Sequence, residues 1–146
     1  MNPHDQLIAD HNALRSQAGA LKTLAAKKSD SLLGEALVSF QHAVQKHFKR
    51  EDAYFRILDQ DKRVPDRGLV HQLRNDHAAV IFTMESLAIR LRKNGLNPDW
   101  LRRFEDMMNV FLPHLDQEEK HLFTFGRRTL TPVECQTITT QFDRGE

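Results

Sequence analysis

Apolar residues recur at intervals of three and four along most of this chain, which is the spacing of one face of an α-helix. Such series run through residues 7–25, 70–91 and 101–125. The clearest runs through residues 33–58, at Leu33, Leu37, Phe40, Val44, His47, Glu51, Tyr54 and Leu58. The pattern predicts four long amphipathic helices, and no stretch of any length alternates as a β-strand would.

Capping and turn residues separate these four segments. Asn2-Pro3 and Asn97-Pro98 each have the form of an N-cap followed by proline in the first helical turn. Pro65-Asp66 is suited to the start of the third helix. Connections are expected at the polar break 27–30, at the charged stretch 59–65, at Asn94-Gly95, and at Gly126, which should end the fourth helix.

Four long helices with short connections favour an all-α fold, an up-down-up-down antiparallel four-helix bundle. We expect the bundle over about residues 3–127 and a C-terminal extension over 128–146. Thr131-Pro-Val-Glu134 has the form of a capping box, which predicts a short helix over about residues 132–143. A length of 146 residues is typical of one domain, so we expect a single domain over 1–146.

Composition and charge exclude several classes of function. With 21 basic and 20 acidic residues, the chain lacks the basic surface of a nucleic-acid binder. It has no apolar run near the roughly 20 residues of a membrane span, and no basic and apolar leader. The single Cys135 excludes an internal disulfide and fits a reducing compartment. We therefore expect a cytoplasmic protein without a nucleic-acid or membrane partner, and the oligomeric state stays open.

Polar residues interrupt the apolar series at one level of the predicted bundle. The second and fourth segments each carry a His-x-x-x-Glu pair, whose members share one helical face. The first and third segments each carry one inward histidine. Counted along antiparallel helices at 1.5 Å per residue, all of these groups lie roughly 12–20 Å from the same end. They are His11, His47, Glu51, His77, His114 and Glu118.

Buried carboxylates are costly unless something pairs with them, and a metal is the simplest common partner for six polar groups. Two divalent ions would be balanced by two bridging glutamates and a hydroxide or oxide, with neutral imidazoles completing the coordination. Mixed imidazole and carboxylate ligands suit iron or manganese and tolerate zinc. Four histidines and two glutamates would leave coordination positions open for a small ligand.

Less specific interpretations exist for each of these residues. A single core histidine is more often a packing residue than a ligand, and a His–Glu pair can be a surface ion pair. The apolar register around both pairs counts against that interpretation. Tyr54 and His121 lie seven residues after His47 and His114, so they should face inward near the site, as further ligands, redox or gating residues, or core. The remaining histidines, His4, His42 and His71, fall off the apolar face and should be solvated.

The order of one histidine, His-x-x-x-Glu, one histidine and His-x-x-x-Glu on successive helices resembles the hemerythrin family, specifically its bacterial HHE cation-binding branch. The segments Glu51-Asp-Ala-Tyr-Phe55 and Glu118-Glu-Lys-His-Leu-Phe123 are similar to that family too. The resemblance covers about residues 4–127. Ferritin-like bundles differ, because they use Glu-x-x-His.

The resemblance implies that the six residues bind two iron ions, joined by an oxo or hydroxo bridge, and that both glutamates bridge them. Glu119 could replace Glu118, since the family's carboxylate can lie five residues after its histidine. Oxygen-carrying hemerythrins have another histidine where this chain has Leu73. A site short of one histidine is more open, which favours sensing, NO binding or redox turnover over reversible O2 carriage.

Three hypotheses follow for function. The first is a non-haem di-iron protein that binds O2 or NO for sensing, storage or delivery. The second is a di-iron redox enzyme that uses the same residues for peroxide or NO reduction, ferroxidase activity or iron supply to damaged iron centres. The third is a metal-free interaction bundle. Of these, the first is our leading expectation.

Overall fold

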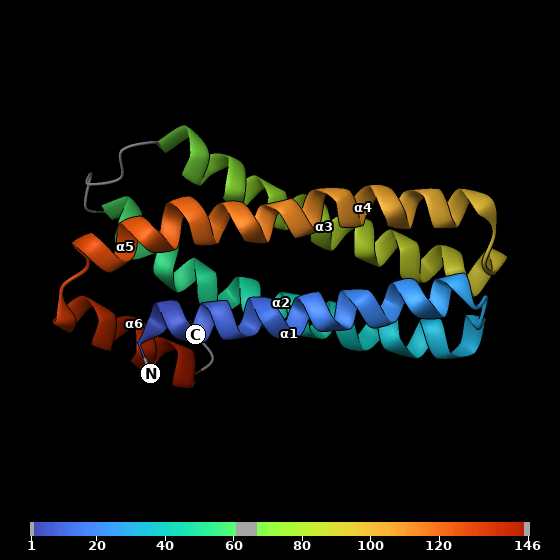
Figure 1. Ribbon diagram of the computed structural model, residues 1–146, viewed down its shortest axis with the longest axis horizontal. Helices are drawn as coiled ribbons and strands as arrows, with labels where there is room; N and C mark the ends of the chain where they lie inside the picture. The colour runs from blue at the N-terminus through green and yellow to red at the C-terminus, as the bar shows by residue number, and fades with distance from the viewer. Residues whose placement is uncertain (1, 61–66, 145–146) are drawn as a thin grey trace.

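The chain folds into a bundle of helices in a computed structural model that describes residues 2–60 and 67–144. Figure 1 shows successive long helices running in opposite directions along the long axis. No strand occurs within these two ranges, so the prediction of an all-helical bundle is confirmed. The long helices are α1 (Pro3–Ala26), α2 (Asp30–Gln60), α3 (Arg67–Asn94) and α4 (Pro98–Gln117).

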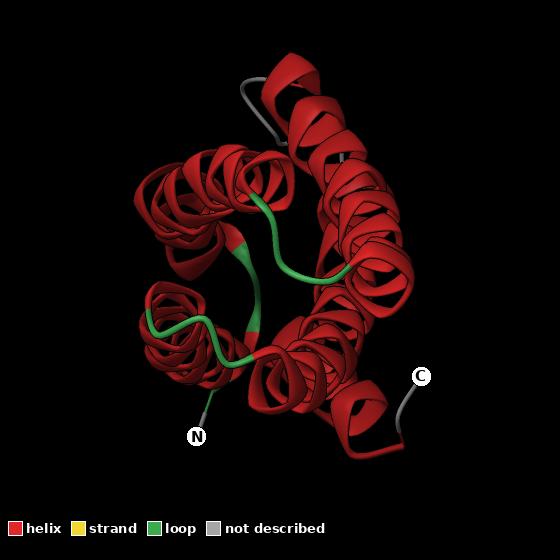
Figure 2. Cartoon of the chain, turned by 90° about the vertical axis from the view of Figure 1, so that its right-hand side faces the viewer, coloured by secondary structure: helices red, strands yellow, loops and turns green. Residues whose placement is uncertain are grey.

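Each helix packs mainly on its neighbours in sequence, and α4 lies beside α1 to close the bundle. Figure 2 looks along the long axis and shows the four helices around a common core. Helix α6 (Pro132–Arg144) lies outside this ring, against α2 and α1. It buries Ile138 and Phe142, so the extension adds to the core at that end.

Local sequence explains where several helices begin. Asn2 caps α1 by accepting a hydrogen bond from the Asp5 amide at 2.9 Å, and Asn97 caps α4 by accepting one from the Trp100 amide at 2.8 Å. Gly95 has φ +71°, a left-handed conformation that glycine adopts without strain. The predicted turn signals at these positions are therefore confirmed.

The predicted capping box before α6 is also present. The Thr131 hydroxyl accepts a hydrogen bond from the Glu134 amide at 3.2 Å. In return, the Thr131 amide donates to a Glu134 carboxylate oxygen at 2.9 Å. The two bonds satisfy amides that the first helical turn leaves open, and they place the start of α6 where the sequence predicted it.

Two helix ends differ from the positions that the sequence predicts. Helix α2 continues through Asp59 and Gln60, so the connection between α2 and α3 begins later than expected. The rest of that predicted loop and the Pro65-Asp66 helix start lie outside the described residues. The prediction that Gly126 ends the fourth helix is wrong, because the helix continues past it through α5 (Thr124–Thr129).

Between α4 and α5 the helix widens into a π-helix, η1 (Glu118–Phe123). A π-helical turn holds one residue more than an α-helical turn, so it rotates all later residues around the axis. Leu122, Phe123 and Gly126 consequently face the core. His121 is exposed, and the prediction that it faces inward is wrong.

The apolar core consists of two clusters, one toward each end of the bundle. One contains Phe40, Trp100 and Phe111 and lies toward the α1–α2 and α3–α4 connections. The other contains Phe55 and Leu73 and lies toward α5 and α6. A layer of buried histidines and glutamates separates them.

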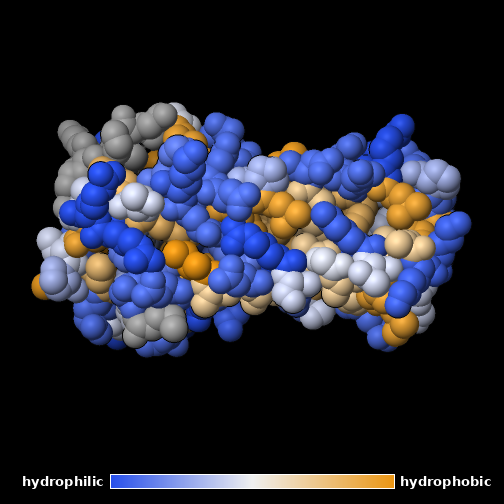
Figure 3. Space-filling model, in the orientation of Figure 1, coloured by the Kyte–Doolittle hydropathy of each residue, from blue (hydrophilic) through white to orange (hydrophobic). Residues whose placement is uncertain are grey.

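The outer surface is largely polar. Figure 3 shows a mainly hydrophilic face, with apolar side chains visible in places between the helices. The most exposed large apolar residues are Phe82 and Val133, at 73 % and 75 %. None of the described helices combines the length and apolar character that crossing a membrane requires.

Gly126 allows a close approach of helices, and its replacement tests this packing. A Cβ at position 126 would overlap the Tyr54 hydroxyl and lie 3.1 Å from His4 Cε1. We expect Gly126→Ala to lower the free energy of unfolding by about 1–3 kcal/mol, as overpacking does. The measurement is urea unfolding followed by circular dichroism.

Gly19→Ala is the matched control, because Gly19 is exposed on α1 and a Cβ there would meet nothing within 4 Å. Removing a mid-helix glycine should stabilise the protein by about 0.5–1 kcal/mol. Equal effects at the two positions would contradict the packing described for Gly126.

Candidate metal centre

The six residues that the sequence selected meet in the layer between the two apolar clusters. They come from four helices, and none is more than 7 % exposed. Two groups of ligand atoms form there, and within each group all atoms lie within 4.8 Å of one another. The residues are His11 on α1, His47 and Glu51 on α2, His77 on α3, His114 on α4, and Glu118 at the start of η1.

The first group combines His11, His47, Glu51 and Glu118. His47 Nε2 lies 2.8 Å from Glu51 Oε1. His11 Nε2 lies 3.2 Å from Glu118 Oε1 and 3.8 Å from Glu51 Oε2. Two imidazole nitrogens therefore face two carboxylates across a small space.

The second group combines His77, His114, Glu51 and Glu118. His77 Nε2 lies 3.3 Å from Glu51 Oε1 and 3.3 Å from Glu118 Oε2. His114 Nε2 lies 3.2 Å from Glu118 Oε2 and 3.1 Å from His77 Nε2. Both glutamates belong to both groups, which is the arrangement that two bridged metal ions require.

Unpartnered atoms provide a test of whether a metal fits. Seven buried side-chain nitrogen or oxygen atoms of the described residues lack a hydrogen-bond partner, and five belong to this layer. They are His11 Nε2, His47 Nε2, both Glu51 oxygens and Glu118 Oε1. Ligand atoms about 2.0–2.2 Å from one ion lie about 3.0–3.4 Å from each other, close to the separations found here. The donor set therefore fits two metal ions.

Three of the four imidazoles are oriented by a carboxylate on their other nitrogen. Such outer carboxylates fix the ring and its tautomer, so that Nε2 is free to bind a metal. Two of them are held in turn by arginines, Asp10 by Arg50 and Glu119 by Arg15. The Nδ1–oxygen pairs are His11 with Glu119 at 2.7 Å, His47 with Asp10 at 3.0 Å, and His114 with Asp76 at 3.2 Å.

Sequence reasoning missed the two aspartates and gave Glu119 a different role. Glu119 was considered as a replacement bridge, whereas here it contacts Nδ1 of His11 while Glu118 occupies the centre. Asp10 and Asp76 each directly precede a selected histidine, but each contacts the histidine of the following helix. The repeated Asp-His dipeptide was the available signal.

His77 lies in different surroundings. Its ring stacks on Phe48, with centroids 3.7 Å apart and planes 4° apart, and lies near Phe55. It also lines a surface pocket of about 510 Å³, together with Phe48, Arg74 and Phe82. A sizeable surface pocket therefore borders the centre on the His77 side. The pocket that includes His47 is smaller, about 130 Å³.

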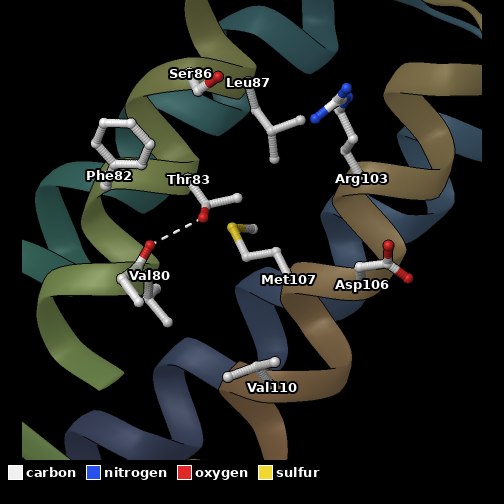
Figure 4. A pocket seen from close by; sticks show the side chains of 10 residues that line it. Val80, Phe82, Thr83, Ser86, Leu87, Arg103, Asp106, Met107 and Val110 are labelled. Atoms are coloured by element: carbon white, nitrogen blue, oxygen red, sulfur yellow. Dashed lines mark hydrogen bonds between the residues drawn. The ribbon is translucent and has the colours of Figure 1, made fainter. Parts of the chain in front are cut away.

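Other pockets lie away from the six residues. Figure 4 shows one between α3 and α4, where Thr83 and Ser86 face Arg103 and Met107, with a volume of about 330 Å³. Another, of about 820 Å³, lies between α2 and α3 and includes Val38. Neither contains a histidine. The histidine-rich layer therefore remains the candidate site.

The remaining histidines and Tyr54 do not join the two ligand groups. His42 and His71 are exposed, as predicted. The prediction that His4 is solvated is wrong, since it is 4 % exposed and its Nδ1 lies 3.0 Å from the Tyr54 hydroxyl. His4 lies off the apolar face of α1, so its position in the sequence indicates an exposed residue. In the structure, α5 and Tyr54 cover the first turn of α1 there.

The histidines and glutamates in this layer shift one another's pKa values. Burial alone would lower the pKa of His11, but the nearby carboxylates of Glu118 and Glu51 outweigh burial and raise it to about 10. The same balance raises the pKa of His77 to about 9 and raises those of His47 and His114. Burial opposes ionisation of Glu51, yet the facing imidazoles hold its pKa well below the usual range. Without a metal, protons on the histidines supply the positive charge in this layer. A metal ion must displace those protons in order to bind.

Comparison with protein families gives one result. A family model described as the hemerythrin HHE cation binding domain matches residues 2–125 of this chain. That range includes all six residues of the two ligand groups. No curated protein and no solved structure matches the chain.

The raised histidine pKa values predict how stability depends on pH. Protonation of His11 and His77 stabilises the metal-free fold fully below the ordinary pKa of 6.5. That contribution should decline as pH rises above 6.5 and be lost as pH passes through about 9 to about 10. The melting temperature of metal-free protein should therefore fall over this range, and that of zinc-loaded protein should fall less.

The double variant Glu51→Gln/Glu118→Gln is the control, because it removes the charges that raise those pKa values. Its melting temperature should change little between pH 6.5 and 9. A slope equal to that of the wild type would show that other groups cause the pH dependence.

Proposed function

Since the chain belongs to the hemerythrin HHE cation-binding domain family, we propose that it is a non-haem di-iron protein that binds O2 or a related diatomic such as NO. Sensing, storage or delivery of that molecule would be its task. The observation that carries the proposal is the pair of buried ligand groups sharing Glu51 and Glu118.

The ligand chemistry supports two ions of intermediate hardness. Each group offers two imidazole nitrogens and the oxygens of two carboxylates, a set that suits iron or manganese and accepts zinc. The two glutamates balance part of the ionic charge, and the apolar clusters on either side keep water out. We assign the metal-ligand role to the six residues of the two groups, with Glu118 rather than Glu119 as the bridge.

The structure leaves room for a small ligand. Two histidines and two shared carboxylates fill fewer positions than the six of an octahedral ion. Leu73, fully buried one turn before His77, offers no donor atom. The surface pocket beside Phe48 includes His77 in its lining. Iron bound here would supply an open coordination position and electrons for a diatomic ligand, while Phe48, Phe55 and Leu73 would provide an apolar wall.

A second candidate function is redox turnover on the same residues. It covers peroxide or NO reduction, ferroxidase activity and iron supply to damaged iron centres. The surface pocket that borders His77 favours it, because a protein built only for stable O2 carriage would shield the bound molecule from solvent. A stable reversible O2 adduct would support binding, and multiple turnovers with peroxide or NO would support the enzyme.

We also propose that residues 1–146 form one domain, with α6 as an extension packed on the bundle. The free thiol of Cys135, half-buried on α6, is consistent with a reducing compartment. We therefore place the protein in the cytoplasm.

Metal analysis tests the ligand assignment. Protein produced with added iron should contain about two irons per chain, since each ligand group offers one set of donors. Glu118→Gln should lose most of both ions, because it removes a ligand that both share. His121→Ala should keep wild-type iron, because that side chain is exposed. Inductively coupled plasma analysis measures the iron, and visible spectra of reduced protein before and after air or NO detect ligand binding.

Glu119→Gln is the sharper comparison, because it leaves the bridge in place and alters only the contact with His11. It should retain iron with reduced affinity. If Glu119→Gln loses both ions while Glu118→Gln retains them, the assignment of the bridge is wrong. Fewer than about one ion per chain in wild-type protein would contradict a dinuclear centre.

The outer carboxylates should tune affinity without being ligands. Asp10→Asn and Asp76→Asn should each weaken metal binding by about 10–100-fold, the usual cost of losing such a partner. Competition with a chelator measures the affinity. Asp99→Asn is the control, since Asp99 is exposed, lies outside both groups, and forms ion pairs with Arg102 and Arg103 on its own helix. Equal losses in all three variants would rule out a role through His47 and His114.

A further inference from the structure

A buried tyrosine and histidine form a pair beside the metal centre that the proposed function does not use. Tyr54 is fully buried, and His4 is 4 % exposed. The Tyr54 hydroxyl lies 3.0 Å from His4 Nδ1, and the two rings meet edge to face at 5.4 Å. They come from α2 and from the first turn of α1, so the hydrogen bond joins two helices.

The direction of this hydrogen bond follows from what the phenol needs. A buried O–H requires an acceptor, and His4 Nδ1 is the partner found for it among the described residues. Burial raises the pKa of Tyr54, so the phenol keeps its proton. Burial, together with Arg127, lowers the pKa of His4, so the imidazole is neutral near pH 7. Tyr54 therefore donates to an unprotonated Nδ1.

Tyr54 is also close to the centre. It follows Glu51 by three residues on α2, which is about 4.5 Å along the helix axis. The Phe123 ring lies 5.5 Å from the Tyr54 ring and 5.4 Å from the His11 ring. Aromatic rings thus connect Tyr54 to His11 through the core.

The surrounding helix is shaped to admit the hydroxyl. A side chain at position 126 would overlap it, so glycine there creates its space. The π-helix η1 turns both Phe123 and Gly126 toward the core. A hydrogen bond that only joined two helices could equally well lie at the surface. This one lies beside the proposed metal centre, and its acceptor, His4 Nδ1, is a base that can take up a proton.

We propose that Tyr54 and His4 form a proton-coupled electron relay that supplies one electron to the metal centre after hydrogen peroxide has oxidised it. The relay rests on the proposed metal site and adds a function to it. Peroxide is the two-electron oxidant, and its reduction to water consumes two protons and two electrons. The relay returns one of those electrons to the centre.

The relay step balances within the pair. Tyr54 loses one electron to the oxidised centre, and its phenolic O–H bond breaks. The proton passes to the lone pair of His4 Nδ1, which leaves a neutral phenoxyl radical and an imidazolium. An external one-electron reductant, such as a thiol, then reduces the radical while the proton returns from His4. The Tyr54–His4 pair lies against α1 and α5, whereas the surface pocket that borders the centre lies at His77.

The chain offers a direct test, because Tyr54 is its only tyrosine. Iron-loaded protein is mixed with hydrogen peroxide, frozen within the reaction time and examined by electron paramagnetic resonance. We expect an organic radical whose hyperfine structure changes when ring-deuterated tyrosine is incorporated. Tyr54→Phe should abolish this signal and retain its iron.

His4→Gln tests the proton acceptor, because the amide oxygen keeps a hydrogen bond but is not a base. Radical formation should slow by about 100-fold, the lower range of what a positioned base contributes. Formation in wild-type protein should also be slower in D2O, a measurement that needs no variant. Melting temperatures and iron contents of both variants are recorded on the same samples.

Each of the following results would overturn a specific part of the proposal. A tyrosine radical in wild type that forms equally fast in His4→Gln and in D2O would exclude His4 as the acceptor. Peroxide-induced changes in the iron absorption without any tyrosine radical would overturn the relay and leave the proposed function intact. Protein that loads no iron would overturn the proposed function and the relay together, and the metal analysis identifies that case.

Discussion

Two fully buried carboxylates, Glu51 and Glu118, are the constraint on which the rest of this structure depends. They lie between two apolar clusters, where an unpaired charge is strongly unfavourable. Four imidazoles surround them, and they can supply protons when no metal is bound or, in the proposed centre, nitrogen ligands. Positive charge in this layer therefore stabilises the bundle, which links folding to protonation and to metal binding.

The arrangement repeats itself within the chain. Helices α1 and α2 contribute His11, then His47 and Glu51, and helices α3 and α4 with η1 contribute the corresponding second set. Asp10 supports His47 as Asp76 supports His114. The two remaining histidines, His11 and His77, do not have equivalent surroundings. His11 has the Glu119 carboxylate on Nδ1, whereas His77 stacks on Phe48 and borders the surface pocket. The larger of the two surface pockets bordering these histidines thus lies at one of two otherwise similar halves.

Sequence could predict the helices and the six central residues because both depend on periodicity. His47 and Glu51 follow the same three-four spacing as Val44 and Leu58, so their inward direction is already contained in the pattern. Contacts between helices are different. The pairing of Asp10 with His47 depends on how far α1 has rotated and shifted against α2, which spacing along one helix does not contain. The burial of His4 by Tyr54 and α5 was missed for the same reason.

The error of direction at His121 shows how one additional residue in a helical turn changes which side chains face the core. An uninterrupted α-helix from His114 would place position 121 inward and Phe123 outward. The π-helical turn beginning at Glu118 adds one residue, so Phe123 enters the core beside His11 and Gly126 faces Tyr54. π-Helical turns are rare, and they occur frequently at functional sites. Here one turn aligns the Phe123 ring between His11 and Tyr54 and turns Gly126 toward the Tyr54 hydroxyl. The irregular turn therefore joins the metal layer to the tyrosine–histidine pair.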